Sequence, residues 1–237
     1  MHSIWIGFDP RETAAFAVCR ESIKYNLSSR TIPVCGVVLE DLKSQGLYTR
    51  PTEMRLGKLY DVISEHPMAT EFAISRFLVP HLARHGTALF MDCDMLVRGN
   101  LARLLEYSPE RQKYAVMCVK HDHRPTNTEK MDGQVQSAYP RKNWSSVMLF
   151  NCDHPSNKKL TPELVNSVPG RDLHRFCWLE DDEIGELGPE WNWLVGHSDP
   201  SIDPKIVHFT DGGPWFESFR NVPYADEWRN FMHRWAA

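Results

Sequence analysis

The segment Thr87-Ala88-Leu89-Phe90-Met91-Asp92-Cys93-Asp94 decides the fold. Its run of Ala, Leu, Phe and Met predicts a buried strand, and two carboxylates follow at once. Side chains at i and i+2 of an extended chain share a face, so Asp92 and Asp94 can converge on one hard cation such as Mn²⁺ or Mg²⁺. An exposed acidic turn would also fit these residues, but open α/β sheets bind ligands at strand ends, which favours a binding site.

The residues before this segment alternate between strand and helix patterns. Apolar runs predict strands at 4–8 and 33–39, and helical patterns cover residues 13–25, 70–82 and 101–105. Between residues 42 and 67, Gly46, Pro51 and Gly57 interrupt the pattern, and we predict loops and short helical turns there. This alternation predicts an α/β fold with a mostly parallel central sheet flanked by helices.

The second half of the chain is less regular. Further strands are predicted at 114–119, 146–150 and 206–209, and a helix at 161–168. The polar stretch 120–143 is longer than an ordinary connection and is typical of a functional or mobile loop. It contains His121-Asp122-His123, a pair of histidines that we assign to an acceptor loop or a polar surface rather than to a metal.

Composition bounds the class of protein. The 237 residues are 42% hydrophobic and 24% charged, which indicates one globular domain over residues 1–237. A net charge of −4 argues against nucleic acid as a partner. No apolar run reaches the length of a membrane span and no signal peptide is recognisable, so we expect a cytoplasmic protein. Six scattered cysteines without a C-x-x-C pair predict free, mostly buried thiols.

Two further sites accompany the Asp-x-Asp pair. His208 stands where a predicted strand enters a turn with Gly212 and Gly213, so it could offer a nitrogen ligand while the glycine backbone approaches a diphosphate. Arg76 lies on the helix before the Asp-x-Asp strand. In this order and spacing, the three motifs resemble the GT-A glycosyltransferases, closest to glycosyltransferase family 8, over about residues 4–215.

The resemblance implies a retaining enzyme that transfers a hexose from a nucleotide sugar, with UDP-hexose as the expected donor. Residues 1–100 would form the nucleotide-binding half and residues 101–237 the half that binds the sugar and the acceptor. Asp92, Asp94 and His208 would hold Mn²⁺ or Mg²⁺ against the diphosphate. Arg76 would contact the diphosphate or donor sugar, as a substrate-binding and catalytic residue. The acceptor could be a glycan, lipopolysaccharide or protein.

The resemblance also assigns the remaining site residues. Phe8 and Asp9, with Arg11 beside them, match the nucleoside-binding loop, and Gly212 and Gly213 would lie against the diphosphate. Asp181 and Asp182, in an acidic run, would stand near the reacting sugar carbon as catalytic residues. Trp144 and Ser145 overlay the turn that lines the donor sugar. These assignments come from the resemblance and not from the spacing.

The chain departs from the family pattern at two places. Trp144 replaces the usual Asn, and Gly213 stands near the place of the diphosphate-binding Lys, for which Arg76 or Lys58 could compensate. Two other functions therefore stay open. One is a phosphatase of the haloacid-dehalogenase type, whose nucleophile and acid/base pair is also an Asp-x-Asp at a strand end. The other is a sugar-nucleotide-binding protein with weak or absent catalysis.

Overall fold

The apolar run of the Asp-x-Asp segment forms β6 (Thr87–Met91), a fully enclosed strand near the middle of the main sheet. The structure is a computed structural model that describes residues 2–106, 113–121, 129–130, 134–135, 141 and 143–236. Within this part of the chain, β6 lies between β1 and β11 and carries four buried side chains in succession. A strand covered on both faces needs apolar residues on both, which explains the absence of alternation in its sequence.

The main sheet has six strands among the described residues, in the order β12-β8-β11-β6-β1-β2. Pairing is parallel for β1 with β2, β1 with β6 and β8 with β12, whereas β11 runs antiparallel to both of its neighbours. The predicted mostly parallel sheet is therefore confirmed, with one reversed strand. The other five strands are β1 (His2–Gly7), β2 (Val34–Val37), β8 (Val116–Cys118), β11 (Val147–Asn151) and β12 (Ile184–Glu186).

A smaller sheet continues the chain beyond the Asp-x-Asp segment. It joins β13 (Trp193–Leu194), β14 (Ile206–His208) and β7 (Met95–Val97), with β14 antiparallel to β7. A second core cluster forms here around Leu96, Val207 and Trp228. The two sheets therefore meet where β6 passes into β7, and this junction positions the site.

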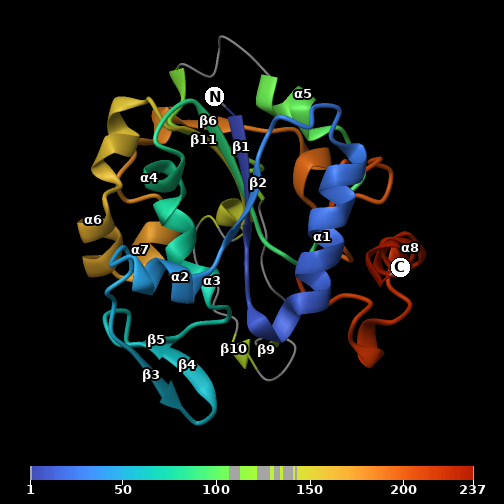
Figure 1. The fold of residues 1–237 in the computed structure, drawn as a ribbon, viewed down its shortest axis with the longest axis horizontal. Helices are drawn as coiled ribbons and strands as arrows, with labels where there is room; N and C mark the ends of the chain where they lie inside the picture. The colour runs from blue at the N-terminus through green and yellow to red at the C-terminus, as the bar shows by residue number, and fades with distance from the viewer. Residues whose placement is uncertain are drawn as a thin grey trace.

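Helices cover both faces of the main sheet (Figure 1). The predicted helix 70–82 is divided into α3, a 3₁₀ turn and α4, in which Pro80 occupies the first turn, where a proline is tolerated. Among the described residues no helix is long and apolar enough to cross a membrane. The α-helices are α1 (Thr13–Asn26), α2 (Leu39–Ser44), α3 (Phe72–Ser75), α4 (Val79–Ala83), α5 (Leu101–Glu106), α6 (Pro162–Ser167), α7 (Gly170–His174) and α8 (Ala225–Ala236).

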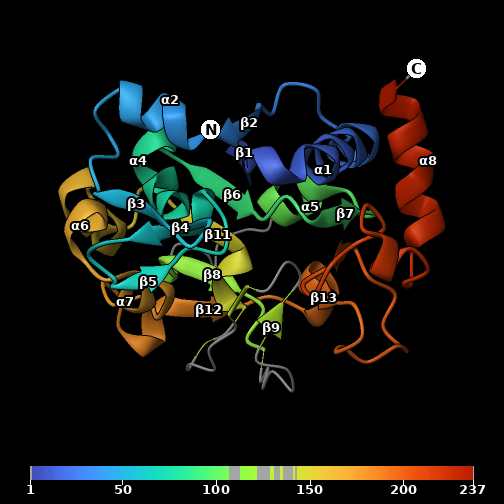
Figure 2. The ribbon, with the colours of Figure 1, turned by 90° about the horizontal axis from the view of Figure 1, so that it is seen from below.

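The chain between residues 45 and 67 corrects the prediction of loops. It forms an antiparallel sheet of β3 (Thr52–Arg55), β4 (Lys58–Asp61) and β5 (His66–Pro67), which projects from the body of the molecule (Figures 1 and 2). The glycine read as a breaker, Gly57, is part of the two-residue turn between β3 and β4. A further short pair joins β9 (Glu129–Lys130) to β10 (Gln134–Val135).

The six cysteines are free thiols, as predicted. Cys19, Cys93, Cys118 and Cys152 are buried, and Cys177 is exposed.

Candidate functional site

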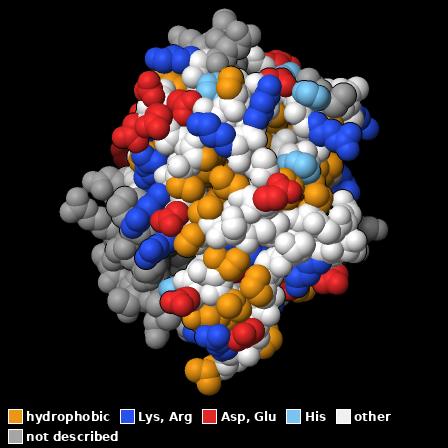
Figure 3. Space-filling view, turned by 90° about the vertical axis from the view of Figure 1, so that its left-hand side faces the viewer, with side chains coloured by type: hydrophobic (Ala, Val, Ile, Leu, Met, Phe, Trp, Pro, Cys, Tyr) orange, Lys and Arg blue, Asp and Glu red, His pale blue; other side chains and the backbone are white. Residues whose placement is uncertain are grey.

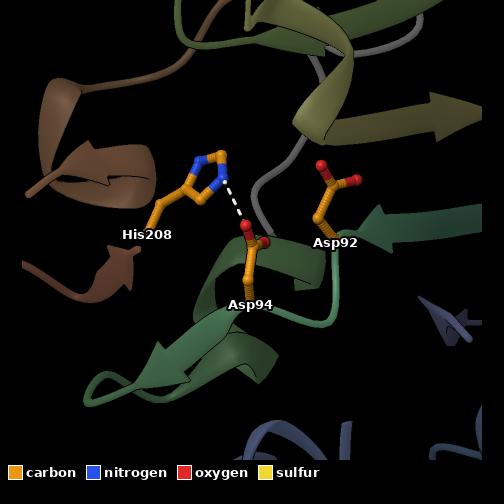
Figure 4. A group of neighbouring side chains, drawn as sticks. All are labelled: Asp92, Asp94 and His208. Carbon is orange, nitrogen blue, oxygen red and sulfur yellow. Dashed lines mark ion pairs between the residues drawn. The ribbon is translucent and has the colours of Figure 1, made fainter. Parts of the chain in front are cut away.

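Asp92, Asp94 and His208 come together where the two sheets meet. Asp92 and Asp94 lie in the connection between β6 and β7, and His208 ends β14, directly opposite Met95 of β7. One ligand atom from each of the three lies within 4.8 Å of the others. Figure 4 shows the imidazole and the Asp94 carboxylate directed toward one another, with His208 Nε2 3.4 Å from Asp94 Oδ2.

A buried amide fixes the orientation of His208. Nδ2 of Asn192 donates to Ser146 Oγ at 2.9 Å and to the Asn143 carbonyl at 3.3 Å, so Oδ1 of Asn192 must be the atom that accepts from His208 Nδ1 at 3.0 Å. The imidazole therefore carries its proton on Nδ1 and presents the lone pair of Nε2 to the carboxylates. Asn192 is fully buried, and no local sequence pattern indicates its role.

Arg76 holds the other carboxylate. Its Nη1 donates to Asp92 Oδ1 at 2.7 Å and to the Ser145 carbonyl at 2.9 Å. Its guanidinium carbon lies 5.1 and 5.0 Å from the ring centroids of Phe72 and Phe90, which leaves the buried cation little freedom to move. The structure thus brings Arg76 next to the Asp-x-Asp pair, whereas its contact with the diphosphate or donor sugar stays a prediction.

Two carboxylates and one oriented imidazole fit a divalent cation. Oxygen donors suit Mg²⁺ and Mn²⁺, and the nitrogen of His208 favours a transition ion such as Mn²⁺ between the two. A third carboxyl, Glu12, lies close by and accepts from Cys93 Sγ at 3.4 Å. Burial and the negative charge of Asp94 raise the pKa of Glu12 to about 7. Three carboxyl groups, those of Glu12, Asp92 and Asp94, are therefore close together, and a bound cation would neutralise their negative charge.

A cavity of about 470 Å³ opens beside this cluster. Asp92 and Asp94 line it together with Arg76, and it extends to α7 and to the segment between β4 and α3. Its size lies within the range of small-ligand sites, roughly 300–1,000 Å³.

Of the three residues in the predicted nucleoside-binding loop, the structure places one at the cavity and two away from its lining. Arg11 lines the cavity, whereas Phe8 is not a lining residue and packs edge-to-face on Phe16. Asp9 is fully buried and its carboxylate accepts from the Arg11 side chain, the Arg11 amide and the Glu71 amide. Burial would raise the pKa of Asp9, but these hydrogen bonds outweigh it and lower the pKa. Asp9 thus holds Arg11 in place at the cavity wall.

The turn before β11 shows one residue that the sequence missed. Ser145 lines the cavity, but Trp144 does not; the Trp144 indole donates to the His121 carbonyl at 3.0 Å. The contact of these two residues with the donor sugar stays a prediction. Asn143 lines the cavity instead, and its buried Nδ2 has no hydrogen-bond partner among the described residues. Asn143 is in the left-handed conformation (φ 63°) and directly precedes Trp144, where the resemblance placed the start of this turn.

The two glycines after His208 have different surroundings. Gly212 lines the cavity at φ 142°, a conformation that side chains rarely adopt. Gly213 does not line it; a Cβ there would lie 1.9 Å from the Trp215 ring, so this glycine allows the indole to pack.

The other predicted residues lie elsewhere. Asp181 and Asp182 are exposed on a 3₁₀ turn (Asp181–Glu183) outside the cavity lining, and Asp181 forms an ion pair with Arg141. Their catalytic role stays a prediction, and their position outside the cavity lining does not support it. Lys58 lies at the β3–β4 turn, away from the cavity lining. Of the stretch 120–143, Asp122 and His123 are outside the described residues.

Comparison with known proteins gives a close relative in sequence. No protein-family model matches the chain. The chain is 46% identical over 238 residues to the protein CDI of Arabidopsis thaliana, covering 98% of this chain and 86% of that protein.

Solved structures resemble the fold at low sequence identity. The bifunctional glycosyltransferase WbbM superposes with a TM-score of 0.62 at 16% identity, covering 97% of this chain and 49% of that one. The glycosyltransferase GlyE of Streptococcus pneumoniae TIGR4 gives 0.60 at 15% identity, covering 97% and 59%. The chain thus spans about half to three fifths of these two proteins. The galactosyltransferase LgtC, solved with donor and acceptor sugar analogs, gives 0.58 at 13% identity, covering 98% and 95%. These likenesses establish a GT-A fold.

Proposed function

The chain belongs to the family of the Arabidopsis thaliana protein CDI and has the GT-A fold, and on these premises we propose that it is a metal-dependent glycosyltransferase that takes a hexose from a nucleotide sugar. The observation that carries the proposal is the Asp92, Asp94 and His208 cluster at the wall of a ligand-sized cavity. The expected donor is a UDP-hexose and the expected cation is Mn²⁺.

The residues would divide the work as follows. A bound cation would act as a Lewis acid toward the diphosphate leaving group. Arg76 keeps the Asp92 carboxylate in place and adds a fixed positive charge to the wall that faces the diphosphate. The Asn143 Nδ2 group, which has no hydrogen-bond partner among the described residues, would donate to a hydroxyl group of the donor sugar. Ser145 lines the cavity near it and would contact the same sugar.

Retention of the anomeric configuration is part of the proposal and rests on the resemblance to family 8. Asp181 and Asp182 would have to reach the sugar from outside the cavity to serve as the groups near its reacting carbon. NMR of the product made from a donor of known configuration decides between retention and inversion. The cytoplasmic location likewise stays a prediction.

The hydrogen bonding of Asp92, the first aspartate of the Asp-x-Asp pair, argues against the phosphatase alternative. That chemistry needs a carboxylate free to attack phosphorus. Here Asp92 accepts a charged hydrogen bond from the buried Arg76, and the chain has the GT-A fold.

The test is Mn²⁺-dependent binding and turnover. We expect UDP-hexoses with Mn²⁺, but not with EDTA, to raise the melting temperature, and one of them to release UDP slowly. Asp94→Asn should abolish both effects. Asp153→Asn is the matched control, because Asp153 also pairs with a histidine, His85 at 3.0 Å, on the exposed surface.

The outcomes separate the candidate functions. A shift with no UDP release in the presence of varied acceptors supports the binding protein. Stabilisation and hydrolysis of phosphate monoesters alone supports the phosphatase. Unchanged Mn²⁺-dependent binding by Asp94→Asn would refute the metal site.

A further inference from the structure

The cavity has two ends of opposite charge. Carboxylates gather at the strand ends, where Asp92, Asp94 and Glu12 lie. The opposite wall carries two arginines and two histidines, from α7, the residue after it and the start of β5; we call Arg171, His174, Arg175 and His66 the basic end. Residues of α7 and of β5 line the same part of the cavity, so this end is built from two segments about a hundred residues apart in the chain (the two elements overlap in the view of Figure 2).

We propose that the basic end binds an anionic group carried by the acceptor, a phosphate, sulfate or carboxylate. The inference rests on the proposed function, because it takes the acidic end as the place of the cation and the donor. One anion-binding wall would then remain for the second substrate.

Three basic residues in and directly after α7 line the cavity. Arg171 and His174 lie on α7, three residues apart and so on one helix face, and Arg175 follows the last residue of the helix. The start of α7 is fixed: the Gly170 amide donates to Ser64 Oγ at 2.8 Å, and a Cβ on Gly170 would lie 2.4 Å from Ile74. The helix backbone is therefore seated closely against α3, and its cations project from a rigid base.

The basic end keeps a surplus of positive charge. Asp61 lines the same wall, but both of its carboxylate oxygens accept from the buried Arg50, at 2.8 and 2.6 Å. Among the described residues on α7, the remaining carboxylate is Asp172, whose Oδ1 lies 3.6 Å from Arg171 Nε, too far for a hydrogen bond. Figure 3 shows blue and pale-blue side chains on this face of the molecule, with red side chains among them.

A chain of contacts joins the two ends. His174 Nδ1 lies 2.6 Å from Ser145 Oγ, and the Ser145 carbonyl accepts from Arg76, which pairs with Asp92. An acceptor anchored on α7 would thus lie next to the residues that face the donor sugar. This places the anion on the acceptor and not on the nucleotide, whose diphosphate belongs at the acidic end.

The test uses the protein saturated with Mn²⁺ and UDP, so that the diphosphate region is filled. Calorimetric titration compares glucose, glucose 6-phosphate, glucose 6-sulfate and glucuronate, with inorganic phosphate as an arm that separates a free anion from a sugar-borne one. We expect at least one anionic sugar to bind about tenfold or more tighter than glucose, because each charge-assisted hydrogen bond favours it. The preference should weaken as ionic strength rises.

The double variant Arg171→Gln/Arg175→Gln should lose this preference while it still binds UDP with Mn²⁺. Arg220→Gln is the matched control, since Arg220 is similarly exposed and likewise lies 3.6 Å from a carboxylate, on Glu217. Equal binding of glucose and all anionic sugars, or a preference that survives in the double variant or is lost equally in Arg220→Gln, would overturn the inference. Inorganic phosphate that binds as tightly as the best anionic sugar would overturn the acceptor part. Failure of UDP to bind would instead count against the proposed function.

Discussion

The two ends of the cavity are built in different ways. At the acidic end, Asp92, Asp94 and His208 are nearly buried, and side chains that are themselves buried hold them. At the basic end, Arg171 and Arg175 are exposed, and only the backbone beneath them is fixed. A cation of fixed radius needs ligands held to within a fraction of an ångström, whereas long cationic side chains can adapt to an anion.

Rigidity at the basic end comes from a buried ion pair. Arg50 and Asp61 are fully enclosed, and Arg50 also donates to the carbonyls of Val165 and Val168, just before α7. Asp61 in turn accepts from the Ser64 amide, and Ser64 Oγ accepts from Gly170. This network ties β4 to the start of α7. The two ends therefore differ in which part of the structure is held in place. At the acidic end it is the side chains of Asp92, Asp94 and His208, and at the basic end it is the backbone that supports Arg171 and Arg175.

The largest expected effect is a loss of stability when the buried Arg50–Asp61 pair is broken. Asp61→Asn leaves Arg50 buried without its charged partner, and we expect the free energy of unfolding to fall by about 3–5 kcal/mol. Urea unfolding measures it. Glu53→Gln, in the exposed Arg55–Glu53 pair of the adjoining strand, is the control and should leave the midpoint nearly unchanged. Equal, small effects of both changes would mean that the buried pair does not support α7.

The same pair predicts how stability depends on pH. Burial raises the pKa of Asp61, but hydrogen bonds from Arg50 and Ser64 outweigh it and lower the pKa below its usual 3.8. A carboxyl with a lowered pKa in the folded state stabilises the protein above the unfolded pKa, and this contribution disappears as the pH falls through the folded value. The stability difference between the wild type and Asp61→Asn should thus be constant near neutrality and shrink only below about pH 4. Shrinkage already near pH 6 would point to another group.

A smaller effect is expected at the acidic end. Asn192→Leu removes the acceptor that holds the His208 proton on Nδ1, and loss of such a partner lowers metal affinity by about 10–100-fold. Mn²⁺ binding, followed by the paramagnetic resonance signal of the free ion, measures it. Asn157→Leu is the control: it removes another buried asparagine whose side chain bonds to Ala115, Asn151 and Trp178, away from His208, and it should leave the Mn²⁺ affinity unchanged. Wild-type Mn²⁺ affinity in Asn192→Leu would show that His208 needs no orientation.

The same contrast explains what the sequence could predict. Asp92 and Asp94 follow a run of apolar residues, and His208 ends another strand, so the local pattern marked each of them, and the resemblance to family 8 joined them into one site. Asn192 and the basic end depend on contacts between distant segments, which no local pattern contains. The resemblance points to Trp144, whereas the structure places the neighbouring Asn143 at the cavity, and the pattern predicts an interruption at Gly57, where the structure closes a hairpin.

The smallest expected effect lies at the tip of this hairpin, beyond the basic end. Leu56 and Gly57 join β3 to β4 with φ of 51° and 75°, as in a two-residue turn that favours Asn-Gly. Leu56 is fully exposed and buries no apolar surface; hydrophobic side chains end the lower tip of Figure 3, where the hairpin lies.

Leu56→Asn should therefore raise the free energy of unfolding by about 0.5–1 kcal/mol, because asparagine tolerates the left-handed conformation better than leucine. Urea unfolding measures the gain. Leu56→Ala removes the same exposed side chain without relieving the backbone, so it should give little change. Anion binding should be unaltered in both variants, since the tip lies outside the cavity lining. A loss of stability in Leu56→Asn would show that the leucine contributes to the fold, and altered anion binding would show that the basic end is shaped by the whole hairpin and not by its buried support alone.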